Sequence, residues 1–407
     1  MSASAQREDF SYPASRFTAY WSVPSLFFIL VLLSLLIWIV LTFFRGAFWQ
    51  VRGFDADLET FITKPPQWPR VLVIVPARNE SQTIARAAES LLRQVYDGEY
   101  RLIVVDDHSE DDTASLAARA ADSAGAETRM NVIAAQALPM WWTGKLWALQ
   151  QGIQGGTAFA ADYFWFTDAD IVHAPDTLER LVSRAEQQNL DLVSLMVLLQ
   201  AKSLAERLLI PAFLYFFLKL YPPKWIADAK AKTAGAAGGC ILLRRTALER
   251  IGGLAAIRGE VIDDCALARV MKRSGDSIWM GLTRESVSLR TYESFGEIRD
   301  LIARTAFTQL RYSSVLLLAT FLGMLLTYLI PVVFAFSQQP TSWRIALAAW
   351  SLMIISYLPT VRFYGLSVLW APALPVAAAF YMYATWVSAV RFWLGRGGQW
   401  KGRALAP

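Results

Sequence analysis

The hydrophobic pattern changes along the chain, and long apolar runs stand towards both ends. Residues 24–44 form a run without any charged residue, about as long as a helix needs to cross a bilayer. This run is too long for the core of a signal peptide, and no cleavage site with small residues follows it. Residues 315–336 can also span, and residues 345–390, broken around Arg362 and by prolines, could hold two spans. The pattern predicts an N-terminal transmembrane helix and C-terminal transmembrane helices.

Between these runs, short hydrophobic stretches alternate with polar loops and helical patterns. VLVIVPARNE (71–80) is a β-branched run that stops at a turn, and residues 81–94 follow with helical spacing and Ser81 as the expected N-cap. The same order recurs at 101–112 and at 162–170 (DYFWFTDAD). Alternation at this interval predicts βαβ units, and therefore an α/β domain with a mostly parallel sheet. Ligands bind at the carboxyl ends of such strands, where the acidic motifs of this chain stand.

Two further stretches join the α/β region to the apolar runs. Residues 204–221 are apolar and aromatic but contain Arg207, Pro211 and Lys219, so they predict either a core helix or a helix in the membrane interface. We favour the interface. Residues 294–314 carry apolar side chains on one face and arginines elsewhere, and this basic amphipathic pattern leads directly into the run at 315.

Composition limits the class of protein. Hydrophobic residues make up 55% of the 407, and the excess is concentrated in the apolar runs. The net charge of +5 comes with no basic stripe interleaved with aromatic residues, so nucleic acid is not an expected partner. Several arginines and lysines instead flank apolar runs, where they suit anionic lipid headgroups. Cys240 and Cys265 show neither metal-ligand spacing nor a disulfide framework.

The motif TDAD (167–170) is the first candidate for chemistry. Asp168 and Asp170 follow an aromatic strand, and two carboxylates at this spacing can hold a divalent metal through oxygen. Such a metal would bind a diphosphate and neutralise its charge as it leaves. The alternative is a turn with solvated acids.

Three other acidic positions stand at the ends of expected strands or helices. Asp107 in VVDD could accept hydrogen bonds from a base or ribose, or merely start a loop, and Glu80 either faces the same cleft or stands near a helix start. Asp263 and Asp264 open a helix, where they either complement its dipole or supply a general base for an acceptor hydroxyl. The two histidines, His108 and His173, are expected to be loop residues rather than catalysts.

Taken together, VPARNE, VVDDHS, WTGK, TDAD, GGC–RR and IDD resemble the family-2 glycosyltransferases of the GT-A fold, over about residues 70–312. Within that family, WWTGKLWAL, AAGGCILLRR and ARTAFTQLRYS are most similar to hopene-associated glycosyltransferases, with ceramide glucosyltransferases as relatives. The resemblance implies an inverting, metal-dependent transferase with Mg²⁺ or Mn²⁺ as cofactor. It also implies a nucleotide-sugar donor, expected to be a UDP-sugar. We expect a membrane lipid acceptor because Asp264 stands about 30 residues before the amphipathic stretch at 294–314, which leads into an apolar run. The resemblance alone makes a hopanoid the candidate lipid.

The resemblance further assigns roles to individual residues. Four would hold the nucleobase and ribose: Pro76, Ala77, Glu80 and Asp107. Two would bind the metal and the diphosphate, and a third would face the donor phosphates: Asp168, Asp170 and Lys145. Gly238 and Gly239 would let the chain pass close to donor and acceptor, and Asp264 would be the base.

The chain departs from the family pattern in two places. The usual Glu-Asp pair is Asp263-Asp264, which keeps the base but shortens its neighbour. Processive synthases and ceramide relatives carry QxxRW or RxxRW, whereas this chain has Gln309, Arg311 and Tyr312 in that region, so the roles of these three residues stay open.

Other functions compete with lipid glycosylation. A processive polysaccharide synthase usually has more spans and an intact QxxRW, and a polyprenyl-phosphate sugar transferase is a further alternative. A catalytically inactive membrane scaffold would be expected to lose the metal or base carboxylates, yet Asp168, Asp170 and Asp264 are all present.

The expected domain order follows from these patterns. A polar tail (1–23) is followed by a transmembrane helix (24–44) and a linker (45–69). The GT-A domain (70–293) comes next, and then an amphipathic segment (294–314), transmembrane segments (315–390) and a basic tail (391–407). We expect the inner membrane, with a cytoplasmic catalytic domain because nucleotide sugars are made in the cytoplasm. The four basic residues of the tail also favour the cytoplasm, but three spans after residue 314 would place it on the opposite side. Either one segment is re-entrant or the charge rule fails.

Overall fold

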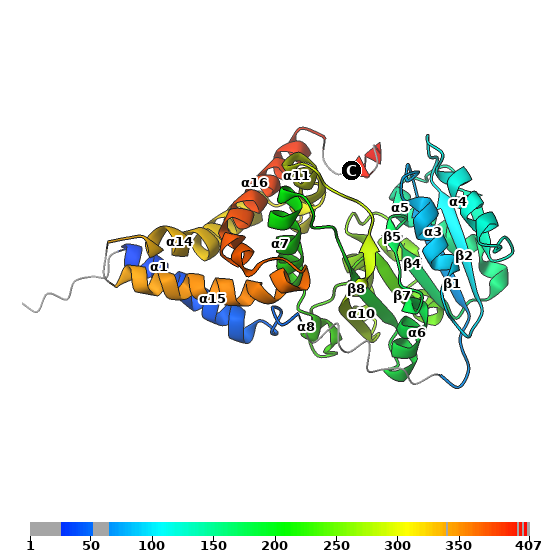
Figure 1. The fold of residues 1–407 in the computed structure, drawn as a ribbon, viewed down its shortest axis with the longest axis horizontal. Coiled ribbons are helices and arrows are strands. Elements are labelled where there is room, and N and C mark those ends of the chain that lie inside the picture. Colours follow the sequence, from blue (N-terminus) through cyan, green and yellow to red (C-terminus); the bar gives the residue numbers. More distant parts are fainter. Residues whose placement is uncertain (1–25, 52–64, 339–340, 397–398, 401–402, 405–407) are drawn as a thin grey trace, which may run out of the picture.

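The computed structural model describes residues 26–51, 65–338, 341–396, 399–400 and 403–404. The expected polar tail (1–23) and residues 52–64 of the expected linker lie outside the described residues, as does part of the basic tail. The described part comprises a sheet domain and a group of apolar helices, joined by a layer of shorter helices (Figure 1).

The sheet domain confirms the predicted α/β class with a mostly parallel sheet. The strand order is β3-β2-β1-β4-β7-β6-β8-β5, and only β7 and β5 run antiparallel to their neighbours among the described strands of this sheet. The strands are β1 (Val71–Ala77), β2 (Tyr100–Asp106), β3 (Met130–Ala134), β4 (Tyr163–Thr167), β5 (Ile171–Val172), β6 (Leu192–Leu198), β7 (Cys240–Arg244) and β8 (Ile278–Ser288).

Helices cover both faces of this sheet, which is why β1 is buried along its whole length. Ile74 of β1 packs against α5 at Gly152, where a Cβ would come within 2.3 Å of Ile74 Cγ2, so a larger residue would force the helix or the strand to shift. The helices of the domain are α3 (Ile84–Leu92), α4 (Thr113–Ser123), α5 (Gly144–Gly155), α6 (Thr177–Gln187), α9 (Arg245–Arg250) and α10 (Asp263–Arg273). The predicted N-cap at Ser81 is wrong, because α3 begins at Ile84 and the Ser81 amide donates to Asp111 instead.

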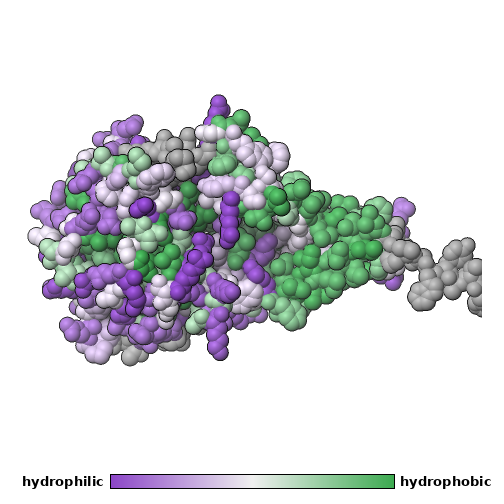
Figure 2. Space-filling view, turned by 180° about the vertical axis from the view of Figure 1, so that it is seen from behind, coloured by the Kyte–Doolittle hydropathy of each residue, from purple (hydrophilic) through white to green (hydrophobic). Residues whose placement is uncertain are grey.

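Four helices are long and apolar enough to cross a membrane: Leu26–Phe44, Ser314–Ala335, Ser342–Phe363 and Val368–Trp393. The first comprises α1 (Leu26–Ile39) and a π-helical turn. The others are α13 (Ser314–Met324) continuing into α14 (Ile330–Ala335), then α15 (Ser342–Phe363), then a 3₁₀ segment and α16 (Leu374–Trp393). Trp38 of α1 donates its indole N–H to the Thr327 carbonyl at 2.7 Å and packs edge-on against Tyr328. Figure 2 shows hydrophobic residues gathered over these helices and hydrophilic ones over the sheet domain.

A layer of helices lies between the two parts: α7 (Leu204–Leu220), α8 (Pro223–Ala227), α11 (Phe295–Ala303) and α12 (Ala306–Gln309). Helix α7 packs against α11, α15 and α16 and is buried along much of its length, so it is the core helix of the two alternatives and not the interfacial one that we favoured. Its first turn carries a capping box between Ser203 and Glu206.

Helix α16 runs across the direction of α1 and α15, along α7 and α11 (Figure 1). Its Tyr381 hydroxyl donates to the Leu209 carbonyl of α7 at 3.1 Å. Near its end, Arg391 forms an ion pair of 2.6 Å with Asp300 of α11. Both contacts hold α16 against the layer beside the sheet domain.

Candidate active site

A cavity of about 470 Å³ opens where the strands end, between the sheet domain and the layer formed by α7 and α11. Helix α10 and the turn that precedes β7 close another side. Nine of the residues singled out from the sequence line this cavity: Pro76, Glu80, Lys145, Asp168, Asp170, Gly238, Gly239, Asp263 and Asp264. Residues separated by nearly 190 positions in the sequence therefore meet at the edge of the sheet where the parallel strands end, as expected for such a sheet.

A series of buried hydrogen bonds holds the TDAD loop in place. The Thr167 hydroxyl donates to the Gly239 carbonyl at 2.9 Å and lies 2.8 Å from Nε2 of His173. The other ring nitrogen of His173 lies 2.8 Å from the Ser286 hydroxyl. Burial lowers the pKa of His173 to about 3, so the ring is neutral near pH 7. His173 therefore holds the loop rather than acting as an acid or base.

Lys145 of α5 is the positively charged residue beside Asp168 and Asp263. Its Nζ lies 2.7 Å from Asp168 Oδ1 and 3.7 Å from Asp263 Oδ2. Burial alone would lower its pKa, but the neighbouring carboxylates of Asp168 and Asp263 outweigh it and raise the pKa above the ordinary lysine value. Lys145 is therefore charged.

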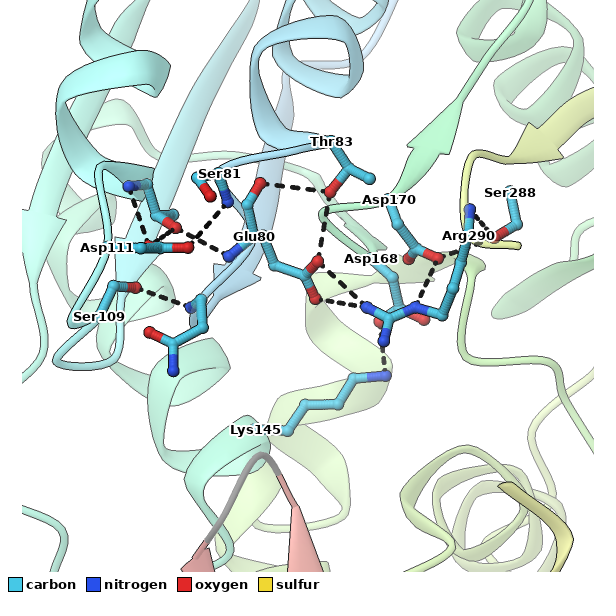
Figure 3. A network of polar contacts seen from close by, with 12 residues as sticks. Glu80, Ser81, Thr83, Ser109, Asp111, Lys145, Asp168, Asp170, Ser288 and Arg290 are labelled. Carbon is cyan, nitrogen blue, oxygen red and sulfur yellow. Dashed lines mark hydrogen bonds and ion pairs between the residues drawn. The ribbon is translucent and has the colours of Figure 1, made fainter. Parts of the chain in front are cut away.

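Arg290, just after β8, is the positively charged residue beside Glu80 and Asp170. The sequence analysis did not predict it as a site residue. Its Nη2 lies 2.8 and 3.1 Å from the two carboxylate oxygens of Glu80, and its Nε lies 3.5 Å from Asp170 Oδ2 (Figure 3). The Ser288 hydroxyl donates to the same Asp170 oxygen at 2.7 Å. The sequence offered a signal, because Ser288 and Arg290 stand at a strand end, as the acidic motifs do. We read the following residues only as the start of an amphipathic segment.

Asp264 stands in the first turn of α10 and turns back towards the loop before β7. Its Oδ2 accepts the Gly238 amide at 2.8 Å, and its Oδ1 accepts the Cys265 amide at 2.7 Å. Burial and the negative charge of Asp263 raise the pKa of Asp264 to about 6, against the opposing effect of Lys145. A carboxylate with this pKa is ionised at pH 7 yet basic enough to accept a proton.

Two glycines avoid tight contacts beside this carboxylate. A Cβ on Gly238 would lie 3.1 Å from Lys145 Nζ and 3.3 Å from Asp264 Oδ2, inside the gap that these two groups face. A Cβ on Gly239 would lie 3.0 Å from Val197. The pair therefore keeps the space beside Lys145 and Asp264 open.

Five predicted site residues do not line the cavity: Ala77, Asp107, Gln309, Arg311 and Tyr312. Ala77 and Asp107 are buried beneath it, and the Asp107 amide donates to the Ala77 carbonyl at 2.8 Å. The Asp107 carbonyl accepts Arg78 Nη1 at 2.6 Å. The roles that the resemblance gave Ala77 and Asp107 remain predictions.

The degenerate QxxRW region lies between the helices and away from the cavity. The Gln309 amide donates to the Tyr221 hydroxyl at 2.7 Å, and Tyr312 stacks on Phe392 with ring centroids 4.4 Å apart. Arg311 and Tyr312 both have positive φ, at 51° and 56°, an uncommon conformation for such residues. Here the segment turns the chain into α13.

The far wall of the cavity is apolar and comes from the helical layer. Phe213 and Phe217, on one face of α7, line it together with Leu301 of α11. The neighbouring aromatics of α7 point elsewhere: Tyr215 packs on Tyr357, and its hydroxyl lies 2.7 Å from that of Ser356 in α15. Of the aromatic residues on this helix, one face meets the cavity and the other anchors the helix.

The carboxylates fit a divalent cation that is shared with a phosphate ligand. Mg²⁺ commonly binds through one or two carboxylates plus substrate phosphates, and Asp168 and Asp170 each keep one oxygen outside the ion pairs described above. No group of three or more His, Cys, Asp or Glu residues that could hold a metal occurs among the described residues. Eight acidic side chains line the cavity, against three basic ones, Lys145, Arg290 and Arg304. A diphosphate would add negative charge to this excess, which a divalent cation would offset.

The comparisons with known proteins bear on the family and the fold. Residues 72–252 match the model of glycosyl transferase family 2. The mannosyltransferase PcManGT from Pyrobaculum calidifontis, solved in complex with GDP-Man and Mn²⁺, is 18% identical, with a TM-score of 0.56 over 88% of this chain and 99% of that one. The glucosyl-3-phosphoglycerate synthase of M. tuberculosis is 21% identical, with a TM-score of 0.37 over 59% of this chain and 84% of that one. No curated protein sequence matches the chain.

The chain therefore carries a glycosyl transferase family 2 domain on a GT-A fold and is a glycosyltransferase. The predicted fold and enzyme class are confirmed, and the match over residues 72–252 supports a family 2 domain in this part of the chain. The likeness to hopene-associated and ceramide glucosyltransferases is not shown by these matches and stays a prediction.

Proposed function

We propose that this glycosyltransferase moves a sugar from a nucleotide sugar to a hydroxyl of a membrane lipid, with inversion and with a divalent cation. One observation carries the proposal. The cavity has a charged wall built by the sheet domain and an apolar wall built by α7 and α11, and these two helices pack against the apolar helices. A substrate with a charged carrier on one side and a lipid on the other fits such a cavity.

The donor belongs against the charged wall. Lys145 and Arg290 supply N–H groups for a diphosphate, and Asp168 and Asp170 would hold the cation that neutralises the leaving group. The structural neighbour PcManGT was solved with GDP-Man and Mn²⁺, which supports a nucleotide-sugar donor and cation use. We expected a UDP-sugar from the sequence, so UDP- and GDP-sugars are both to be tried.

Asp264 would act on the acceptor. Its carboxylate takes the proton of the acceptor hydroxyl while the oxygen of that hydroxyl attacks the anomeric carbon of the sugar. The bond to the nucleoside diphosphate breaks on the opposite side, so the configuration at the anomeric carbon inverts. The amides of Gly238 and Cys265 fix the carboxylate, which leaves its orientation set before the acceptor arrives.

The acceptor belongs against the apolar wall. Phe213, Phe217 and Leu301 offer contact to a hydrocarbon group, while Asp300 and Arg304 at the same wall offer polar contacts to a headgroup. A water-soluble acceptor would gain nothing from a wall that adjoins the apolar helices. The resemblance to hopene-associated enzymes makes a hopanoid the first lipid to test.

The four candidate spans support a membrane location. We propose the inner membrane with the catalytic domain in the cytoplasm, as the supply of nucleotide sugars requires. Removing residues 1–44 should leave the protein in the membrane fraction, because the helices from 314 onwards still hold it. Folded protein in the soluble fraction would contradict this location.

Product analysis tests the acceptor. The purified protein in lipid is incubated with radiolabelled nucleotide sugars and extracted membrane lipids, alongside an Asp264→Asn variant as control. Acid-stable label in the organic phase with the wild-type protein alone would support the proposal. Label only in water-soluble or polymeric product would overturn it in favour of a synthase, and organic label released by mild acid would indicate a glycosyl phosphate. Absence of nucleoside diphosphate release with every donor would favour an inactive scaffold.

A further inference from the structure

Arg290 occupies an unusual position between two carboxylates that were assigned to different tasks. The sequence resemblance gave Glu80 to the nucleoside and Asp170 to the metal, yet both side chains contact this one guanidinium (Figure 3). Glu80 and Asp170 are largely buried, with side chains 12% and 13% exposed, whereas the Arg290 side chain is 37% exposed and lines the cavity. Two buried carboxylates therefore hold the guanidinium of Arg290, while part of this side chain faces the cavity.

The two contacts of Arg290 differ in quality. Both carboxylate oxygens of Glu80 accept hydrogen bonds from Arg290 Nη2, at 2.8 and 3.1 Å. Asp170 accepts only a longer one from Arg290 Nε, at 3.5 Å. Asp170 has other support, because Ser288 donates to its carboxylate and the Leu289 amide donates to its carbonyl at 2.7 Å. Asp170 can therefore exchange Arg290 for another cation and stay in place, while Glu80 keeps Arg290 at the cavity.

We propose that Arg290 is a diphosphate-binding residue that also competes with the divalent cation for Asp170. With no ligand, the guanidinium shares the charge of Glu80 and Asp170. When the cation and the diphosphate arrive together, Asp170 passes to the cation and Arg290, still held by Glu80, turns its free N–H groups to the phosphate oxygens. A guanidinium presents five donors in a planar fork that suits phosphate, which an ammonium cannot do. Glu80 then anchors an arginine and does not read the nucleoside.

This role predicts two effects of opposite sign. Removing the guanidinium should strengthen the binding of Mn²⁺ alone, because a competing positive charge leaves Asp170. The same change should weaken binding of a diphosphate in the presence of Mn²⁺, because a charge-assisted contact is lost. A residue that merely supports the fold would weaken both.

The test compares Arg290→Gln with wild-type protein in detergent. Binding of Mn²⁺ alone is measured by the electron paramagnetic resonance signal of free Mn²⁺, and binding of inorganic pyrophosphate at saturating Mn²⁺ by calorimetry. We expect Mn²⁺ to bind roughly threefold or more tightly, and pyrophosphate about ten- to hundredfold more weakly. The matched control is Arg244→Gln, since Arg244 also pairs with two carboxylates, Glu186 and Asp191, but does not line the cavity. The control should change neither affinity.

A second variant guards against a folding defect. Arg290→Lys keeps the charge but not the fork, so Mn²⁺ affinity should stay near wild type while pyrophosphate binds about tenfold more weakly. Weaker Mn²⁺ binding in Arg290→Gln, or unchanged pyrophosphate binding in both variants, would overturn the proposal. The inference rests on the proposed diphosphate donor. However, the assays contain neither acceptor nor nucleoside, so they stand whether or not the acceptor is a lipid, and the Mn²⁺ measurement decides the competition by itself.

Discussion

The two walls of the active-site cavity are built on different principles. The donor wall is a set of paired charges, in which Lys145 and Arg290 each contact carboxylates from different parts of the chain. The acceptor wall contains packed aromatic and aliphatic side chains, such as Phe213 and Phe217, on helices that also contact the apolar bundle. Charged walls recognise by specific geometry and apolar walls by shape and area, so changes in the two should affect different kinetic constants.

The largest effect should come from the residue between the walls. Asp264→Asn removes the base but keeps the size of the side chain, so turnover should fall by about 10²–10⁴-fold while nucleotide-sugar binding persists. Single-turnover kinetics together with donor titration would separate the two. A variant with near-normal turnover would move the base to another residue, with Asp263 first in line.

Withdrawal of the divalent cation should be the next largest effect, and it should act through the donor wall. Excess chelator should reduce activity by at least about a hundredfold, because a diphosphate would then face Asp168 and Asp170 without neutralisation. Restoring Mg²⁺ or Mn²⁺ should recover activity in wild-type protein and much less in Asp170→Asn. Full turnover in chelator would refute cation dependence.

The pH dependence should follow the carboxyl of Asp264. Its pKa is raised to about 6, and the base must be ionised, so kcat/KM should drop about tenfold per pH unit below that value. The raised pKa means that the folded state favours the protonated form, so this group gives stability at low pH that is lost as pH rises through about 6. Acid inactivation near pH 5 should therefore precede loss of the circular dichroism signal. An activity profile flat from pH 7 to pH 5 would contradict the assignment.

The smallest effect should come from the acceptor wall. Phe213→Ala should raise the KM for a lipid acceptor by roughly three- to tenfold and leave the donor KM unchanged, because only apolar contact is lost. Phe216→Ala is the matched control on the same helix. Phe216 packs on Tyr328 and Tyr381 away from the cavity, so its loss should lower thermal stability rather than acceptor affinity. An equal change in both KM values for Phe213→Ala would mean that the walls are not separate.

The donor wall could be predicted largely from the sequence because its signals are local. Each acidic motif ends a strand or opens a helix, and the carboxyl ends of the parallel strands must meet at one edge. The apolar helices were also predictable, since run length and hydropathy alone define them. Their pattern needs no knowledge of distant residues.

What the sequence did not indicate depends on contacts between distant positions. The placement of Arg290 at the cavity depends on its contact with Glu80, 210 positions away. The burial of α7 depends on α15 and α16, so its composition alone left core and interface open. Helix α3 begins at Ile84 rather than just after Ser81, whose amide bonds Asp111 from a neighbouring loop. Tertiary contact overrode the local preference in each case.

The position of helix α16 bears on the number of times that the chain crosses the membrane. Crossings by α1, by α13–α14 and by α15 would bring the chain back to the side of the catalytic domain, and a fourth crossing would carry the tail away again. An α16 that lay along α7 and α11 at the membrane surface would add length without adding a crossing. The basic tail would then lie on the same side of the membrane as the catalytic domain, and the rule that positive charge stays inside would agree with the topology.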